Sequence, residues 1–296
     1  MKPKDWITFL ALTFIWGASF LWIKIAVRDI GPLSLVAFRL LFGLAGLLVF
    51  FPFLKPKIPR ERRVWVNLAI LGITSSAIPW FFISWAETTI DSAIASVLNG
   101  TVPLFTMIVA HFALHDERIT AERVLGLLLG FGGVVVLSLH PAGPGDVVSP
   151  AHKSMTVLAT GAMLLATFSY AVGAVHARRS LGEVSPLIQA FFSLVFSLIV
   201  ILAAVFVVEG APRVPVRLDT WAALGWLGVL GAGIASYLLY KLLHSVGPTR
   251  TSLVTYTLPV VGVTLGVVIL KETFDWLLVA GALLIVSGVW VVNHRK

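Results

Sequence analysis

The feature that most constrains this chain is a series of apolar stretches, each about as long as a lipid bilayer is thick. A membrane-spanning helix needs about 20 apolar residues, because each residue advances the helix by about 1.5 Å. Short segments with turn residues or charges separate ten such stretches: 5–27, 32–54, 64–86, 92–114, 121–139, 155–177, 184–208, 219–243, 249–270 and 275–293. We therefore predict an all-α membrane protein with ten transmembrane helices.

The composition argues against most soluble functions. Charged residues make up 12% of the chain, whereas soluble domains carry roughly 25%. So few charges cannot cover a water-exposed surface, which argues against a soluble enzyme or a nucleic-acid-binding protein. The net charge of +8 has another explanation, because the cytoplasmic loops of membrane proteins collect Lys and Arg. The absence of Cys excludes disulfides, thiolate metal ligands and thiol nucleophiles.

The distribution of basic residues predicts the orientation. With a cytoplasmic N-terminus, the inside segments hold 15 of the 22 Lys and Arg residues and the outside segments hold 6. This asymmetry favours an inner (plasma) membrane protein with both termini in the cytoplasm. The first apolar stretch is too long for the core of a signal peptide, so we expect it to remain as a helix.

The two halves of the chain match one another. Nine residue pairs recur in chain order at offsets of 154 to 156: Lys24/Arg178, Pro32/Pro186, Gly72/Gly228, Phe81/Tyr237, Ser96/Ser252, Pro103/Pro259, Glu117/Glu272, Gly126/Gly281 and Gly133/Gly288. Small insertions in loops account for the drift in offset, so the order favours an internal duplication. A Pro- and Gly-rich linker at 140–153 separates the predicted repeats, 1–145 and 146–296.

Each half contains five predicted spans, an odd number, so the second half enters the membrane from the opposite side. Inverted repeats are common in secondary transporters, whose substrate sites lie near the bilayer midplane between the repeats. Two similar halves of opposite orientation give inward-open and outward-open states of similar energy. The duplication therefore predicts transport by alternating access around a central cavity.

Several short motifs occur in a characteristic order along the chain. They are Trp16-Gly17-Ala18-Ser19-Phe20, Phe38-Arg39, Ala95-Ser96-Val97, Pro103-Leu104-Phe105, Glu117 with Gly126, Gly130 and Gly133, Ser252 with Pro259, and Glu272 with Gly281 and Gly288. Together they resemble the EamA-type, ten-helix branch of the drug/metabolite transporter superfamily over nearly the whole chain. The resemblance implies two packed five-helix bundles and the export or exchange of small metabolites. Amino acids, with aromatic or large neutral ones preferred, are the nearest expectation.

Polar residues inside the hydrocarbon region are costly and are candidates for function. Ser96 and Asn99 share one face of the fourth span, and Ser252 and Tyr256 lie in the matching part of the ninth. One interpretation is that these side chains line the pathway and bind substrate. The alternative is that the hydroxyl groups bond to their own helices and pack against neighbouring ones.

Two prolines mark candidate hinges in these spans. Pro103 and Pro259 each remove a backbone donor, which can kink a helix and free a carbonyl group. We expect the fourth and ninth spans to bend there during transport.

Aromatic residues inside the spans are candidates for the cavity wall. Trp16, Trp80, Phe81, Tyr170 and Tyr237 lie away from the membrane interface or occupy matching positions in the repeats. An aromatic wall would bind apolar or aromatic side chains over a broad surface. Helix packing and lipid contact are the alternatives.

Arg39 is the one basic residue placed well inside a predicted span. Its planar guanidinium group could receive a substrate carboxylate. It could equally extend toward the membrane surface or pair with Glu87 or Asp91 at the ends of neighbouring spans.

No Asp or Glu lies near the middle of a predicted span. Proton relays and cation sites generally use buried carboxylates or His. Facilitated diffusion or exchange of a zwitterionic or neutral substrate is therefore expected. The alternative is an exporter of drugs or other metabolites, with or without coupling to protons.

An intramembrane enzyme is the rival from another class. Gly143-Pro144-Gly145-Asp146 matches a short pattern of intramembrane aspartyl proteases, and His111 and His115 are one helical turn apart. The first is better explained as a turn, and the second as a solvated helix end. We therefore expect no catalytic residues, no metal and no cofactor. The expected partners are a small-molecule substrate and the lipid bilayer; nucleic acid is not expected, and a homodimer is left undecided.

Overall fold

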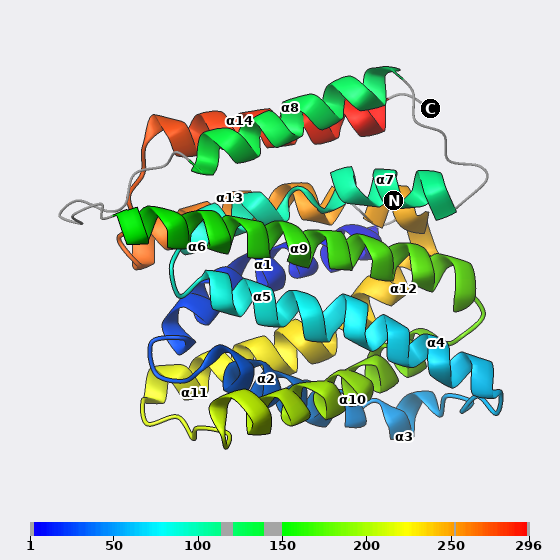
Figure 1. The fold of residues 1–296 in the computed structure, drawn as a ribbon. Coiled ribbons are helices and arrows are strands. Elements are labelled where there is room, and N and C mark those ends of the chain that lie inside the picture. Colours follow the sequence, from blue (N-terminus) through cyan, green and yellow to red (C-terminus); the bar gives the residue numbers. More distant parts are fainter. Residues whose placement is uncertain (1–2, 114–120, 139–149, 252, 295–296) are drawn as a thin grey trace.

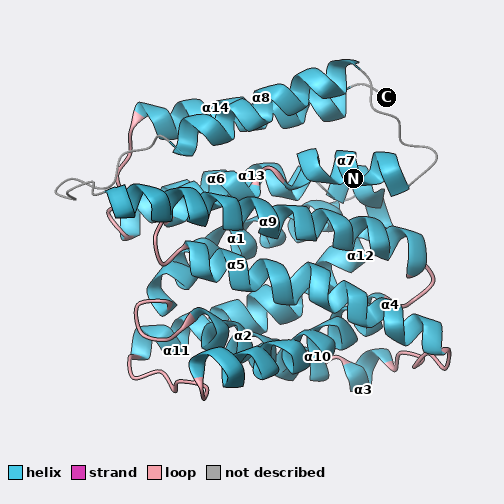
Figure 2. Cartoon of the chain, in the orientation of Figure 1, coloured by secondary structure: helices cyan, strands magenta, loops and turns pink. Residues whose placement is uncertain are grey.

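The computed structural model describes residues 3–113, 121–138, 150–251 and 253–294, and every regular element in these ranges is a helix (Figure 2). The first half contains α1 Pro3–Ala26, α2 Pro32–Leu48, α3 Phe51–Leu54, α4 Arg62–Gly72, η1 Ile73–Ala77, α5 Ile78–Ala86, α6 Ser92–Asn99, α7 Val102–Ala113 and α8 Ala121–Ser138. The second contains α9 Pro150–Ser180, α10 Pro186–Ala204, η2 Val205–Glu209, α11 Leu218–Gly225, η3 Trp226–Ile234, α12 Ala235–Thr251, α13 Leu253–Ile269 and α14 Trp276–His294. The all-α prediction is confirmed for this described part.

Six helical segments of the described chain are long and apolar enough to cross a membrane: Pro3–Ala26, Arg62–Ala86, Ser92–Ala113, Ser154–Ser180, Pro186–Glu209 and Leu218–Leu242. Shorter apolar helices cover Pro32–Leu48, Val124–Leu137, Thr257–Ile269 and Trp276–Val291. Because in hydrocarbon a helix satisfies its own backbone hydrogen bonds, these segments suit a bilayer.

The helices pack in layers, as Figure 1 shows. At the top of the view α8 and α14 lie side by side, and this pair makes the most extensive helix–helix contact. Below it, α1 packs against α13, α5 against α9, and α6 against α13. At the bottom, α2 packs against η3 and α10, and α10 also packs against α4. Elements from the two halves of the sequence therefore contact each other in every layer.

One large apolar core joins the two halves. Leu35, Leu98, Ile188 and Leu227 are all fully buried in it. A second, smaller cluster surrounds Leu12 where α1 meets α12 and α13. The halves thus share one interior rather than forming separate bundles.

Two of the three π-helical segments in the described residues lie at corresponding positions in the two halves. η1 joins α4 to α5, just before Pro79, and η3 joins α11 to α12. The widened turns leave carbonyl groups to accept bonds from other helices: the Ser169 hydroxyl donates to the Thr74 oxygen at 2.8 Å, and the Trp16 indole donates to the Gly231 oxygen at 3.0 Å. Such turns are frequent at functional sites.

A pair of tryptophan contacts also recurs at the offset of 156. The Trp65 indole N–H donates to the Pro59 oxygen at 3.1 Å, and the Trp221 indole N–H donates to the Pro215 oxygen at 3.2 Å. Both contacts fix the loop that precedes a long span. The same local structure therefore forms at both places.

Several boundaries differ from the predicted ones. α9 begins at Pro150, inside the predicted linker, whose residues 140–149 lie outside the described residues. α12 continues to Thr251 through Gly247 and Pro248, which lie between the predicted spans 219–243 and 249–270. Gly and Pro are tolerated within membrane helices because neighbouring groups satisfy the freed backbone positions. The second predicted span, 32–54, is divided into α2 and the short α3.

The α8–α14 contact depends on glycine. A Cβ atom on Gly133 would lie 2.7 Å from the Gly281 carbonyl oxygen, closer than real Cβ atoms approach, whereas a Cβ atom on Gly132 meets nothing within 4 Å. Small residues let membrane helices approach closely where no hydrophobic force drives them together.

We expect Gly133→Ala to destabilise the protein by about 1–3 kcal/mol, because it overpacks this contact. The neighbouring Gly132→Ala should leave stability unchanged or raise it slightly, since Ala is the better helix former. Thermal unfolding of both variants in detergent measures the difference. Equal melting temperatures would contradict the proposed role of Gly133.

Candidate functional site

A buried arginine lies where several helices of the bundle converge. The side chain of Arg39, on α2, is almost fully buried, and its guanidinium carbon lies 4.0 Å from the centre of the Trp80 ring on α5. Such a cation–π contact is worth more away from water. Among the described residues no hydrogen-bond partner is found for the Arg39 Nε. This donor is available to an acceptor that the described residues do not supply.

Three further elements complete the surroundings of Arg39. Tyr170, on α9, interacts electrostatically with Arg39. Gly231, on η3, is so close that a Cβ there would lie 3.8 Å from the Arg39 Nη2, and its carbonyl oxygen accepts the Trp16 indole N–H. The structure therefore brings together four residues that the sequence analysis selected separately.

The fourth predicted span is interrupted at its middle. α6 ends at Asn99 and α7 begins at Val102, and the Gly100 amide bonds to the Val97 oxygen at 2.9 Å in a tighter turn. The Asn99 Oδ1 is buried and no hydrogen-bond partner is found for it in the described ranges. Its free acceptor suits a ligand donor, so Asn99 stays a predicted binding residue.

The two predicted hinge prolines lie in different surroundings. Pro103 follows the break between α6 and α7, whereas α13 continues through Pro259. A Cβ atom on Gly100 would lie 3.9 Å from the Pro259 ring, so the break in one span faces the proline of the other. Their function as hinges stays a prediction.

The remaining predicted residues lie in packing contacts. The Ser96 hydroxyl donates to the Ala93 oxygen at 2.7 Å and lies against Gly262, which favours the packing interpretation. The Tyr237 ring stacks on Phe50 with centroids 5.4 Å apart, and Phe81 contacts Phe82. Their roles in substrate binding remain predictions.

Some sequence candidates cannot be placed. Ser252 lies outside the described residues, as do His115 and the segment 143–146. Tyr256 belongs to α13, but its side chain is outside the described part. In the described residues, no group of three or more His, Cys, Asp or Glu could hold a metal ion.

Glu87 is more deeply buried than its predicted position at the end of a span indicated. Glu87 follows α5 directly, yet its side chain is 0% exposed. No hydrogen-bond partner is found for either carboxylate oxygen in the part of the chain that the structure describes. Lys24 donates from Nζ to the backbone oxygens of Glu87 and Ile90 at 2.9 and 2.6 Å. Burial of Glu87 depends on tertiary packing, for which the sequence has no signal. The sequence indicated only that Glu87 could pair with Arg39.

Two carboxylates cap helices at the end of the bundle near Glu87. Glu209 accepts the Leu33 and Ser34 amides at the start of α2, both at 3.0 Å. Glu272 accepts the Ser92 and Ala93 amides at the start of α6, at 2.8 and 2.9 Å. Negative charge at a helix N-terminus is favourable, because unpaired amides and the helix dipole both attract it. We call the end of the bundle that contains Glu87 and the helix caps made by Glu209 and Glu272 the capped end.

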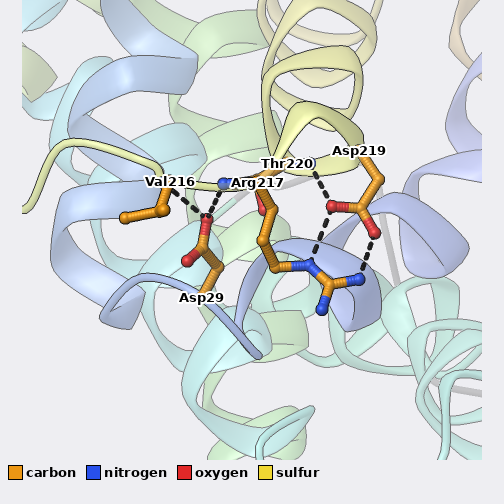
Figure 3. Close-up of polar contacts among 5 residues, drawn as sticks. All are labelled: Asp29, Val216, Arg217, Asp219 and Thr220. Carbon is orange, nitrogen blue, oxygen red and sulfur yellow. Dashed lines mark hydrogen bonds and ion pairs between the residues drawn. The ribbon is translucent and has the colours of Figure 1, made fainter.

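A third contact joins the loops of the two halves at the capped end, as Figure 3 shows. Asp29, after α1, accepts the amides of Val216 and Arg217, both at 3.1 Å, in the loop before α11. These bonds lower the pKa of Asp29 below its ordinary value of 3.8, with the Arg217 amide as the largest cause. The Arg217 guanidinium itself pairs with the Asp219 carboxylate.

Comparison with known proteins gives matches over the whole length of the chain. The profile of the EamA-like transporter family matches residues 5–139 and again residues 158–294. An uncharacterized transporter of Archaeoglobus fulgidus is 25% identical over 99% of this chain and 100% of its own. The uncharacterized inner membrane transporter YedA of Escherichia coli is 27% identical over 90% of this chain and 84% of its own.

The fold also matches a solved structure. One crystal structure aligns with a TM-score of 0.70 and 24% identity, covering 99% of this chain and 98% of that one. At this identity the likeness shows the shared fold alone.

The Asp29 contact predicts a pH dependence. Because its pKa is lowered in the folded state, Asp29 stabilises the loop contact above its ordinary pKa, and this contribution is lost as pH falls through the folded value. We expect hydrogen exchange at Val216 and Arg217, corrected for intrinsic rates, to accelerate as pH drops below about 3.8. Asp29→Asn should remove this response. Asp219→Asn should retain it, and a loss in both variants would contradict the assignment.

Proposed function

The chain belongs to the EamA-like transporter family, and we propose that it is a ten-helix secondary transporter that exports small metabolites. Amino acids, with aromatic or large neutral ones preferred, are the proposed substrates. The observation that carries this proposal is the buried, incompletely bonded Arg39 guanidinium among Trp80, Tyr170 and Trp16. We further propose a location in the inner (plasma) membrane with both termini in the cytoplasm.

Two inverted repeats are part of the proposal. The family profile matches the chain twice, once in each half. The packing is consistent with a twofold relation: exchanging the halves converts the α2–η3 contact into the α10–η1 contact, and the α1–α13 contact into the α9–α7 contact. The paired π-turns and the paired tryptophan contacts support the same relation.

The proposed substrate binds by charge and by apolar contact. A substrate carboxylate would accept from the Arg39 guanidinium and provide the counter-charge that a buried cation needs. The Trp80, Tyr170 and Trp16 rings would contact the substrate side chain. Asn99 would add an acceptor for the substrate ammonium group. This combination suits a zwitterionic amino acid better than a cationic drug.

Transport would proceed by alternating access. We propose that the two repeats move against each other, with bending at Pro103 and Pro259. Exchange driven by the substrate gradient is the mechanism that the sequence favours, and coupling to protons is its alternative. Lipid is the surrounding partner, and dimer formation through α8 and α14 is compatible with the exposed apolar side chains of Leu128 and Leu283.

Uptake of a labelled amino-acid panel into proteoliposomes tests the function. We expect Phe, Trp or Met to enter, and uptake below saturation to fall at least about thirtyfold in Arg39→Gln, because losing one partner of a buried charge pair costs roughly 2–5 kcal/mol. Arg28→Gln is the matched control, since Arg28 is exposed after α1. Failure of the whole panel, with folded protein, would exclude the proposed substrates. Equal uptake by Arg39→Gln would exclude the proposed site.

A further inference from the structure

Glu87 is a buried acid that the proposed binding site does not use. Its side chain is 0% exposed, and neither carboxylate oxygen has a hydrogen-bond partner among the described residues. An ionised carboxylate in such a place loses its hydration and gains no bonds in return. Burial therefore favours the protonated, neutral form of Glu87 in this conformation.

Neighbouring charges do not replace the missing bonds. The charged groups that act on Glu87 are Lys24 from α1, Arg39 from α2 and Glu272 after α13, while Tyr170 from α9 acts through Arg39. The Lys24 ammonium group donates to backbone oxygens, and the Arg39 guanidinium lies over Trp80. Glu272 is itself acidic and disfavours a second negative charge nearby. No group among these donates a hydrogen bond to the Glu87 carboxylate.

The contacts that close the capped end surround Glu87. Lys24 ties α1 to the connection between α5 and α6, through the backbone of Glu87 itself. Glu272 ties the segment after α13 to the start of α6. These contacts keep Glu87 away from water. Separation of the same elements would hydrate the carboxyl group and allow it to ionise.

We propose that Glu87 is a proton-binding site whose protonation is linked to closure of the capped end. A proton on Glu87 stabilises the closed, dry arrangement, and loss of that proton stabilises the open, hydrated one. The linkage itself is independent of any substrate. Its role in transport rests on the proposed function, where it makes the conformational cycle sensitive to the proton gradient.

A thiol reporter tests the linkage without substrate. The chain contains no Cys, so a single Cys is labelled without background. Ser84→Cys places it one turn before Glu87, at a side chain that is fully buried in the closed state. Thr88→Cys, at an exposed position, supplies the intrinsic pH dependence of the labelling reaction. The maleimide labelling rate of the Ser84→Cys variant, divided by that of the Thr88→Cys variant, then measures opening of the capped end.

We expect this ratio to rise with pH, by up to about tenfold per pH unit, the limit for one linked proton. In Glu87→Gln, which is permanently neutral, the ratio should stay low at every pH. Glu183→Gln, an exposed acid at the opposite end, should behave like the native chain. Glu87→Asp should keep a pH dependence.

Two results would overturn the proposal. One is a ratio of labelling rates that does not change with pH in the chain that retains Glu87. This measurement does not require any Glu87 variant to fold. The other is the same pH dependence in Glu87→Gln as in the native chain. Because labelling requires no substrate, either result leaves the proposed transport function standing. Failure of amino-acid uptake would likewise leave the linkage intact.

Discussion

The structure depends on one constraint: polar and charged groups within the apolar interior must find partners inside the protein. Helices satisfy most of the backbone. Where the ladder is widened, as in η1 and η3, side chains of other spans supply the missing donors, and Trp16 and Ser169 do so for Gly231 and Thr74. Carboxylates accept hydrogen bonds from the amides that the starts of α2 and α6 leave unpaired within the helix. Hydrogen bonds between spans therefore act together with the apolar core to hold the two halves against each other.

Buried polar groups that lack a hydrogen-bond partner are therefore candidates for function. The Arg39 Nε, the Asn99 Oδ1 and the Glu87 carboxylate are all buried without hydrogen-bond partners in the described residues. A donor, a neutral acceptor and a titratable acid are what binding of a zwitterion and response to protons require. Their positions on α2, at the break between α6 and α7, and directly after α5 place them on elements that a transport cycle would move.

The sequence predicted the all-α class and the family, and both are confirmed. It also selected Trp16, Arg39, Trp80 and Tyr170, which the structure brings together and whose role in binding stays a prediction. Length, hydropathy and repeat spacing are local properties, so they can be read from the chain. Burial of Glu87 and the bonding of Ser96 to Ala93 depend on contacts between distant segments, for which the sequence has no signal. The capping by Glu209 was missed for the same reason, because its partners at Leu33 and Ser34 lie about 175 residues away.

The central claim is that Arg39 recognises a substrate carboxylate. The most direct test is calorimetric binding of phenylalanine and of phenylalaninamide, which lacks that carboxylate, to the native protein and to Arg39→Gln. The account predicts that the native protein prefers the acid and that Arg39→Gln binds both about equally, since the discriminating donor is gone. An unchanged preference in Arg39→Gln, or no preference in the native protein, would contradict it.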